Sequence, residues 1–266
     1  MFSLLQQIEG HGLQVIFDFT NCNFLRQNAV AFLGGIARMV NLRGGTVEFA
    51  LDTLGNDIRA NLAQNGFLEA FGYPEQPWTG NSIPYREDPC GSVNTEEEVV
   101  KYLGSYWLGR GWLQINPSLR DAIVGKVWEI YANAFEHGRS DIGIFSCGQF
   151  YPNLRVLKLA AVDFGVGIPA NVRECLSKPE MRDCDALRWA LCAGNSTCTG
   201  IARGMGLDLL KSFLKANQGR LEIYSHRGYT VIDMDTELHL DRCSRFQGTL
   251  VNITLKCDES FFDLAS

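Results

Sequence analysis

The sequence lacks the features that mark several common classes of protein. It has no run of about 18 apolar residues, so no membrane-spanning helix is expected. Residues 1–7 carry neither a basic segment nor a cleavage site of the signal-peptide type, which predicts a cytoplasmic protein. Lys and Arg total 24 against 30 Asp and Glu, for a net charge of −6, and no Lys/Arg cluster occurs. Nucleic acid and membrane surfaces are therefore not expected as partners.

Cysteine pairs with metal-site spacing are also missing. The chain has nine cysteines, an odd number, and no C-x-x-C pair, which disfavours both a zinc site and a disulfide framework. Reduced, partly buried thiols are expected instead. The cysteines are Cys22, Cys90, Cys147, Cys175, Cys184, Cys192, Cys198, Cys243 and Cys257.

Two familiar nucleotide-binding patterns are absent as well. No G-x-x-x-x-G-K-[ST] loop occurs, and no G-x-G-x-x-G joins an early strand to a helix. The remaining composition is that of a globular protein, with 266 residues, 46% hydrophobic and 20% charged. This length supports one large or two modest domains with buried cores.

The first 72 residues alternate strand and helix patterns and predict a small α/β domain. Strands are expected at 13–19 and 45–51, and helices at 24–40 and 56–71. Half of the eight prolines then fall within residues 73–90. This composition predicts a linker or surface loop, so the domains are expected at 1–72 and 95–266, with a linker at 73–94.

A second α/β unit follows the expected linker. Its last three strands have no helices between them, which predicts antiparallel pairing at that side of the sheet. Helices are expected at 95–107, from Asn116-Pro117-Ser118 to Gly138, within 171–192 and after Arg203–Leu207, and strands at 142–147, 156–162, 220–225, 229–234 and 248–256.

The helix that ends at Gly138 carries the first candidate site. Glu129, Asn133 and His137 follow one another at four-residue steps and therefore share one helix face. An amide oxygen suits a Mg²⁺ ion that keeps several waters, and a carboxylate can take a proton from an attacking water or hydroxyl. A solvated helix face is the alternative interpretation.

The second candidate site lies at the end of the strand 156–162. Asp163 follows this strand, and Gly165 and Gly167 turn the chain away from it. An aspartate at this position can accept a hydrogen bond from an amino group, while the glycines let the backbone approach a planar ring. A simple strand-end turn is the alternative.

The third candidate site is the turn Arg203-Gly204-Met205-Gly206-Leu207. Its glycines permit a tight turn directly before an apolar helix, whose free N–H groups can bind phosphate. Arg203 can add a charge-assisted contact. A helix N-terminus that binds nothing is the alternative.

Together the three motifs resemble the GHKL superfamily of ATPases. Glu129–Gly138 matches its N box, Asp163–Gly167 its G1 box and Arg203–Leu207 its G2 box, while Gly248-Thr249 is similar to its late G-T motif. The resemblance spans about residues 95–256.

The resemblance implies a Bergerat-type sandwich of helices on a mixed sheet, in which Mg²⁺ is held through Asn133 and adenine is recognised by Asp163. It further implies a lid between Ile168 and Arg203, and Glu129 as catalytic base. The implied ATP-binding residues are Asn133, His137, Asp163, Gly165, Gly167, Arg203, Gly204, Met205, Gly206, Leu207 and Thr249.

The front domain resembles a STAS domain, the fold of anti-sigma antagonists, over the strand 15–19, the segment Asn23-Phe24-Leu25 and the helix ending at Gly66-Phe67. Where antagonists place a phosphorylatable Ser, this chain has Arg26-Gln27-Asn28. Because neither Gln nor Asn accepts a phosphoryl group, we expect a docking or dimerisation surface rather than a substrate of the chain's own nucleotide domain.

These observations predict a cytoplasmic regulator that binds ATP and Mg²⁺, hydrolyses ATP slowly and controls a protein partner through its nucleotide state. The N box form is similar to that of anti-sigma serine kinases, so a serine/threonine protein kinase is the first alternative. A module that holds the nucleotide without catalysis is the second.

Overall fold

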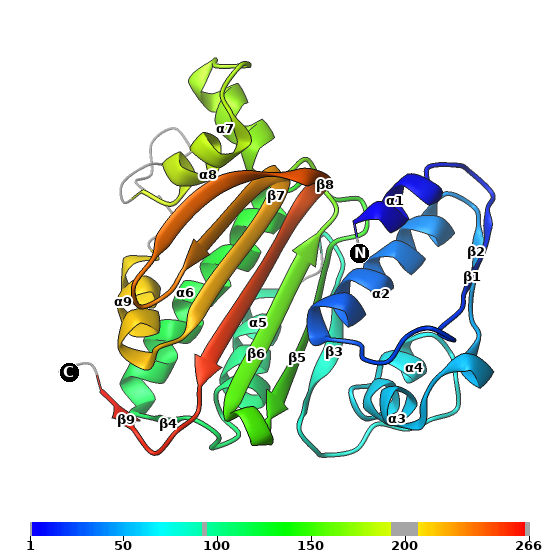
Figure 1. Ribbon diagram of the computed structural model, residues 1–266, viewed down its shortest axis with the longest axis horizontal. Helices are drawn as coiled ribbons and strands as arrows, with labels where there is room; N and C mark the ends of the chain where they lie inside the picture. The colour runs from blue at the N-terminus through cyan, green and yellow to red at the C-terminus, as the bar shows by residue number, and fades with distance from the viewer. Residues whose placement is uncertain (1, 92–94, 193–206, 264–266) are drawn as a thin grey trace.

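A five-stranded antiparallel sheet forms the centre of the molecule (Figure 1). The computed structural model describes residues 2–91, 95–192 and 207–263. The strand order is β3–β5–β6–β8–β7, with the bounds Ser82–Asp88 (β3), Ile144–Tyr151 (β5), Val156–Asp163 (β6), Glu237–Lys256 (β8) and Arg220–Ile232 (β7). Helices cover both faces, so the α/β class predicted from the sequence is confirmed.

The expectation of a mixed sheet is wrong, because all four pairings between these described strands are antiparallel. β5 and β6 are joined through the short turn Pro152–Leu154 (η3), and short connections of this kind reverse the chain direction. β7 and β8 pair antiparallel as expected, with an irregularity at residues 225–228. β7 bends back there, at His226 with a φ of 54°, and this brings Arg220 at its start within 3.3 Å of Asp233, just past its end.

Alternate residues of the strands face two separate cores. In β6, Leu157, Leu159 and Ala161 belong to one core, whereas Val162 belongs to the other. This period of two is that of an extended strand. It places Asp163, the last residue of β6, on the same face as Ala161.

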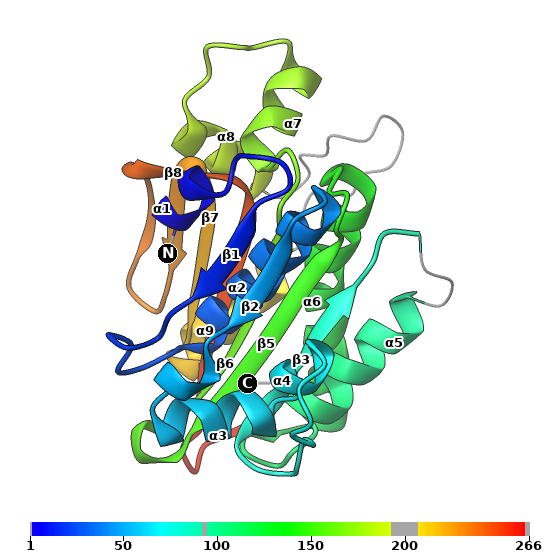
Figure 2. The same ribbon diagram turned by 90° about the vertical axis from the view of Figure 1, so that its right-hand side faces the viewer.

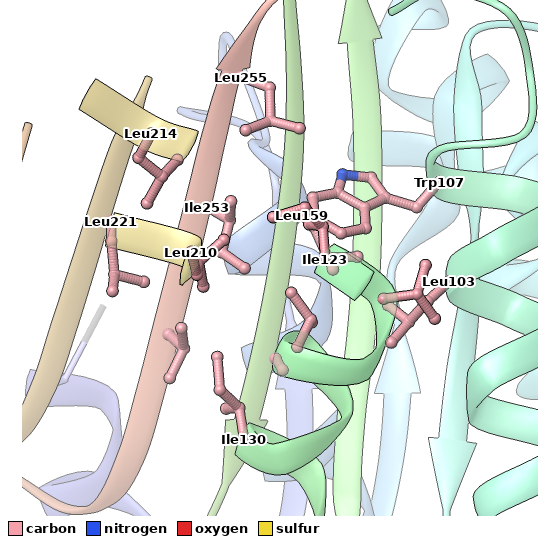
Figure 3. Packing of buried hydrophobic residues seen from close by; sticks show 14 of the residues in the cluster. Leu103, Trp107, Ile123, Ile130, Leu159, Leu210, Leu214, Leu221, Ile253 and Leu255 are labelled. Carbon is pink, nitrogen blue, oxygen red and sulfur yellow. The ribbon is translucent and has the colours of Figure 1, made fainter. Parts of the chain in front are cut away.

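The first core lies between the sheet and three helical segments. These are α5 (Thr95–Tyr102) with its π-helical continuation η2 (Leu103–Trp107), α6 (Pro117–His137) and α9 (Asp208–Asn217). Figure 3 shows Ile123 and Ile130 of α6 against Leu159 and Ile253 of the sheet. Leu210 of α9 packs beside them.

α6 begins and ends where the sequence predicts. The side chain of Asn116 accepts a hydrogen bond from the backbone N–H of Ser118 at 2.8 Å, and Pro117 occupies the first turn. Its C-cap is Gly138.

The N-terminal segment covers the opposite face of the sheet (Figure 2). Its elements are α1 (Ser3–Gln7), β1 (Gln14–Phe17), α2 (Gln27–Leu42), β2 (Thr46–Phe49), η1 (Leu51–Thr53), α3 (Asn56–Gln64) and α4 (Phe67–Ala70). β1 and β2 are parallel and connected through α2. The expected single helix over 56–71 is interrupted between α3 and α4, because Gly66 adopts a φ of 80°.

α2 packs directly on the central sheet, against β5 and β6. A Cβ atom at Gly34 would overlap the ring of Tyr85, and one at Gly35 would overlap the ring of Phe164. The helix backbone therefore lies in contact with these two aromatic rings. The second core includes residues of both α2 and the sheet.

The expected linker contains a strand of the central sheet. Residues 82–88 form β3, which pairs with β5 at the sheet edge, so the expectation of a loop is wrong for them. Pro84 is tolerated because an edge strand leaves some backbone N–H groups without a ladder partner. The chain thus passes from the N-terminal segment directly into an edge strand of the central sheet, whose other four strands come from residues 144–256.

Helices follow β6 as the sequence predicts for residues 171–192. They are α7 (Ile168–Leu176) and α8 (Asp183–Ala190). A small parallel sheet joins β4 (Gln114–Ile115) to β9 (Phe261–Phe262) near the C-terminal end of the described chain. No helix within residues 2–91, 95–192 or 207–263 is long and apolar enough to cross a membrane.

Candidate functional site

A cavity of about 860 Å³, including its open mouth, lies on the α6 face of the sheet. Its floor is the sheet, lined by Ile144, Ala161, Asp163, Ile223, Thr249 and Val251. One side, the α6 wall, is lined by Ile130, Asn133, Ala134 and His137. The other side, the α7–α8 wall, is lined by Ile168, Asn171, Val172, Trp189 and Ala190.

Five predicted binding residues line this one cavity. They come from three separate parts of the sequence and are Asn133, His137, Asp163, Gly167 and Thr249. The first and second candidate motifs therefore meet, and Thr249 joins them through the pairing of β6 with β8, in which it lies opposite Asp163.

On the α6 wall, a hydrogen bond fixes the amide of Asn133. Its Nδ2 donates to the backbone carbonyl of Glu129 at 2.7 Å. A backbone carbonyl oxygen can only accept a hydrogen bond, so the Asn133 atom that faces it must be Nδ2. Oδ1 is therefore the atom left for a ligand. A neutral oxygen on the cavity wall suits a Mg²⁺ ion bound mainly by water and phosphate.

Glu129 lies one helical turn from Asn133 and does not line the cavity. Its Oε1 accepts an ion-paired hydrogen bond from Lys126 Nζ at 2.6 Å, and its side chain is 36% exposed. The expected base is thus held by a neighbouring cation on the same helix.

Asp163 is the buried acid of the cavity floor and is only 4% exposed. Burial raises the pKa of its carboxyl from 3.8 to about 6, although the backbone N–H of Gly165 and the hydroxyl of Thr249 favour the charged form. The Gly165 N–H donates to Oδ1 at 2.9 Å. The carboxyl is therefore oriented by its neighbours and is ready to accept a further hydrogen bond.

The turn of residues 164–167 is fixed on the C-terminal end of α6. Val166 N–H donates to the carbonyl of Gly138 at 2.7 Å, and a Cβ atom at Gly165 would overlap that same carbonyl. Gly167 adopts a φ of 78° directly before α7. Both glycines are thus required by backbone geometry, although only Gly167 lines the cavity.

His226, which the sequence motifs missed, also holds this turn. It lies at the bend of β7, and its Nε2 donates to the carbonyl of Val166 at 2.7 Å, which places the proton on that nitrogen. Burial lowers the pKa of its imidazole. Ser225 Oγ accepts from the N–H of Ile168 at 3.0 Å, so the start of α7 is bound to β7 as well.

The α7–α8 wall is anchored by polar contacts. Asn171 Nδ2 donates to the carbonyl of His137 at 2.9 Å, which joins α7 to α6. Arg173 and Asp183 form an ion pair between α7 and α8. Asp241 of β8 accepts from the N–H of Cys184 at 2.8 Å. Within the expected lid, residues 168–190 therefore form an ordered side of the cavity.

The remaining predicted residues have other positions. Arg203, Gly204, Met205 and Gly206 of the third motif lie outside the described residues. Leu207 is fully buried in the first core, where its role is packing.

Two further residues of the cavity, Asn171 and Trp189, carry no sequence motif. They reach it through α7 and α8, whose positions depend on contacts with Asp241 and the bend of β7. No local sequence pattern predicts that Asn171 and Trp189 belong to a site.

No cluster of three or more His, Cys, Asp or Glu suited to a metal is present in the part of the chain that the structure describes. A nucleotide-bound Mg²⁺ needs fewer protein ligands, usually one or two, because phosphates and waters fill its other positions. Asn133 Oδ1 fits that requirement.

No protein-family model matches the sequence, and no curated protein is significantly similar to it.

Proposed function

We propose that the protein binds ATP with Mg²⁺ in this cavity, as a regulator of the GHKL type whose nucleotide state controls a protein partner. One observation carries the proposal: the residues of two motifs and Thr249, separated in the sequence, line a single cavity. A solvated helix face and a simple strand-end turn, the alternatives for these two motifs, would have no reason to meet in one cavity.

The floor of the cavity supports adenine as the base. Asp163 offers a carboxylate oxygen to the exocyclic amine, and the Thr249 hydroxyl lies beside it. Guanine has an acceptor oxygen at the corresponding position, which would face a buried carboxylate. The protein should therefore prefer ATP to GTP.

The α6 wall supports a magnesium-bound phosphate chain. Asn133 Oδ1 is the protein ligand, and His137 can donate to a phosphate oxygen. When bound, Mg²⁺ would neutralise phosphate charge and orient the terminal phosphoryl group. The third motif, which lies outside the described residues, would add backbone N–H groups to the phosphates.

Coupling to a partner is supported by the neighbouring residues Asp163 and Phe164. Asp163 faces the cavity, whereas Phe164 contacts α2 at Gly35. A ligand that shifts this turn also shifts the contact with the N-terminal segment, which we propose as the docking or dimerisation surface. We place this regulator in the cytoplasm, where buried thiols such as those of Cys147, Cys184 and Cys257 stay reduced.

The ion pair between Glu129 and Lys126 favours one second candidate, a module that binds ATP without turnover. The carboxylate of Glu129 already accepts a hydrogen bond from Lys126 Nζ at 2.6 Å and lies outside the cavity lining, so it is not placed to take a proton from an attacking water. Slow hydrolysis requires Glu129 to leave Lys126 when the nucleotide binds.

Thermal unfolding with nucleotides tests the binding proposal. Mg·ATP at about 100 times its dissociation constant contributes roughly 2.7 kcal/mol, which raises the melting midpoint by several degrees. The same concentration of Mg·GTP should give a much smaller rise. Equal shifts, or no shift with ATP, would contradict the proposal.

Labelled γ-phosphate ATP distinguishes the three outcomes for chemistry. Free phosphate indicates an ATPase, label on a co-purified protein indicates a kinase, and stable bound ATP indicates a binding module. Glu129→Gln is the matched variant, because it removes the base and keeps the shape. Phosphate release at the parental rate in this variant would exclude Glu129 as the base.

A further inference from the structure

Figure 1 shows α7 and α8 beyond one end of the central sheet and α6 along one of its faces. Both helical walls contribute apolar side chains to the cavity in which a planar base would reach Asp163. The α6 wall offers the aliphatic side chains of Ile130 and Ala134. The α7–α8 wall offers the indole of Trp189.

Among the described residues that line the cavity, Tyr131 and Trp189 are the only Phe, Tyr or Trp side chains. Tyr131 is 1% exposed, and its hydroxyl is hydrogen-bonded to Ser146 Oγ of β5 at 2.7 Å. Tyr131 is therefore committed to the core. Trp189 is partly exposed and lines the cavity.

The position of Trp189 is set by the contacts of α8 with the sheet. Leu187 and Leu191, on either side of it in the sequence, are buried in the first core. A Cβ atom at Gly228 would clash with the side chain of Leu187 and approach the backbone of Asp183, so α8 lies directly on the bend of β7. A ligand that meets a pre-positioned indole loses less entropy on binding.

We propose that Trp189 stacks on one face of the bound base and supplies affinity for the adenine nucleoside. This assignment rests on the proposed function, and it separates two tasks within the same site. Stacking tolerates any base, because every base has a π-face, whereas the hydrogen bond to Asp163 selects adenine. Trp189 sets how tightly a nucleoside binds, and Asp163 sets which one.

Calorimetric titration of the full chain tests the assignment. Base stacking on an aromatic side chain contributes roughly 1–3 kcal/mol by alanine substitution, which corresponds to roughly 5- to 150-fold in the dissociation constant. We expect Trp189→Ala to weaken ATP, ADP and adenosine by the same factor in this range. Its preference for ATP over GTP should stay that of the parent protein, and Mg²⁺-tripolyphosphate, which has no base, should bind equally to both.

Trp78→Ala is the matched control, because Trp78 is 50% exposed and does not line the cavity. It should bind every probe as the parent does. Trp189→Phe keeps an aromatic face and should retain most of the affinity. In the parent protein, adenosine should quench tryptophan fluorescence, and this quench should disappear in Trp189→Phe although adenosine still binds. If Trp189→Ala does not fold, the fluorescence comparison of the parent protein with Trp189→Phe tests the stacking by itself.

The outcomes separate the two proposals. Absence of ATP binding by the parent protein would overturn both. Binding by the parent with unchanged affinity in Trp189→Ala, or an unchanged quench in Trp189→Phe, would overturn the role of Trp189 alone. A loss confined to ATP and tripolyphosphate would place Trp189 at the phosphates and overturn base stacking.

Discussion

Asp163 is a buried carboxyl group whose ionised form lowers the stability of the folded protein. Because burial raises its pKa from 3.8 to about 6, the folded protein binds this proton more tightly than the unfolded chain does. The stability that it contributes is fully present below about pH 4 and is lost as the pH rises through about 6. At neutral pH the ionised group costs roughly 3 kcal/mol, since each pKa unit corresponds to about 1.4 kcal/mol.

Asp163→Asn should therefore be more stable than the parent above pH 6 and should bind ATP poorly. The amide keeps the shape of the side chain and has no charge to desolvate. Urea unfolding at pH 5 and at pH 7.5 measures the difference. The advantage of the variant should be larger at pH 7.5, and a difference that does not change with pH would contradict the assigned pKa. A stabilising substitution that removes binding is typical of a functional site.

At the residue scale, the local sequence predicted Asp163 as a site residue but did not predict the residues that surround it. An aspartate at the end of an apolar strand followed by two glycines is visible in the sequence, so its position could be predicted. Its burial depends on the α7–α8 wall and on Thr249, which lies 86 positions later in the numbering. Trp189 and His226 depend on the same tertiary contacts and could not be predicted.

At the scale of elements, the contact of α2 with the turn of residues 164–167 is set by Gly35. A Cβ atom there would overlap the ring of Phe164, which also packs against Phe32 and Phe145. Gly35→Ala should destabilise the protein by about 1–3 kcal/mol, because the surrounding rings leave no room for adjustment. Urea denaturation measures this loss.

Gly125→Ala provides the control for helix propensity. Gly125 lies in the middle of α6, is exposed, and would place a Cβ atom with nothing within 4 Å. The substitution should stabilise the protein by roughly 0.5–1 kcal/mol, because alanine is the better helix former. If Gly35→Ala stabilises to the same degree, α2 does not pack on Phe164 as described.

Asp183 connects α8 to both α7 and β7 through polar contacts. It forms the ion pair with Arg173, accepts from the N–H of Arg227 at 3.0 Å and lies 3.8 Å from His226 Nδ1. Asp183→Ala should loosen α8 and expose the bond after Arg188 to trypsin. Asp185→Ala, in the same helical turn, removes only an exposed contact with Arg188 and should leave the cleavage rate unchanged. Equal cleavage in the two variants would show that Asp183 does not fasten α8.

The elements that the sequence predicted best are those with strong local signals. α6 has a cap, a proline in its first turn and a glycine at its end, and it was predicted to within a residue. β3 was missed because its proline and the prolines around it indicate a loop, whereas pairing with β5 decides its structure. The first half of β8 has no alternating pattern and is a strand because it pairs with β7.

At the scale of the whole molecule, the sheet has a hydrophobic core on each face. The proline-rich stretch at 73–90 indicated a boundary between two domains. The structure instead leads the chain from the N-terminal segment into β3, so that α2 and the sheet share the second core. Proline content reports where local structure is interrupted, and it carries no information about which surfaces are buried against each other.

Removal of residues 1–72 should therefore leave a chain that does not fold. The deletion would expose Phe145, Val162, Phe246 and Leu250, all within 1% of complete burial in the second core. Exposing four such side chains costs about 6–12 kcal/mol, which is comparable to the whole stability of a typical domain. Calorimetry of the full chain should show a single unfolding transition, and the truncated chain should aggregate or show no cooperative transition. A soluble 73–266 fragment that unfolds cooperatively and binds ATP would show that the nucleotide site folds by itself, and the N-terminal segment would then be a separable docking domain.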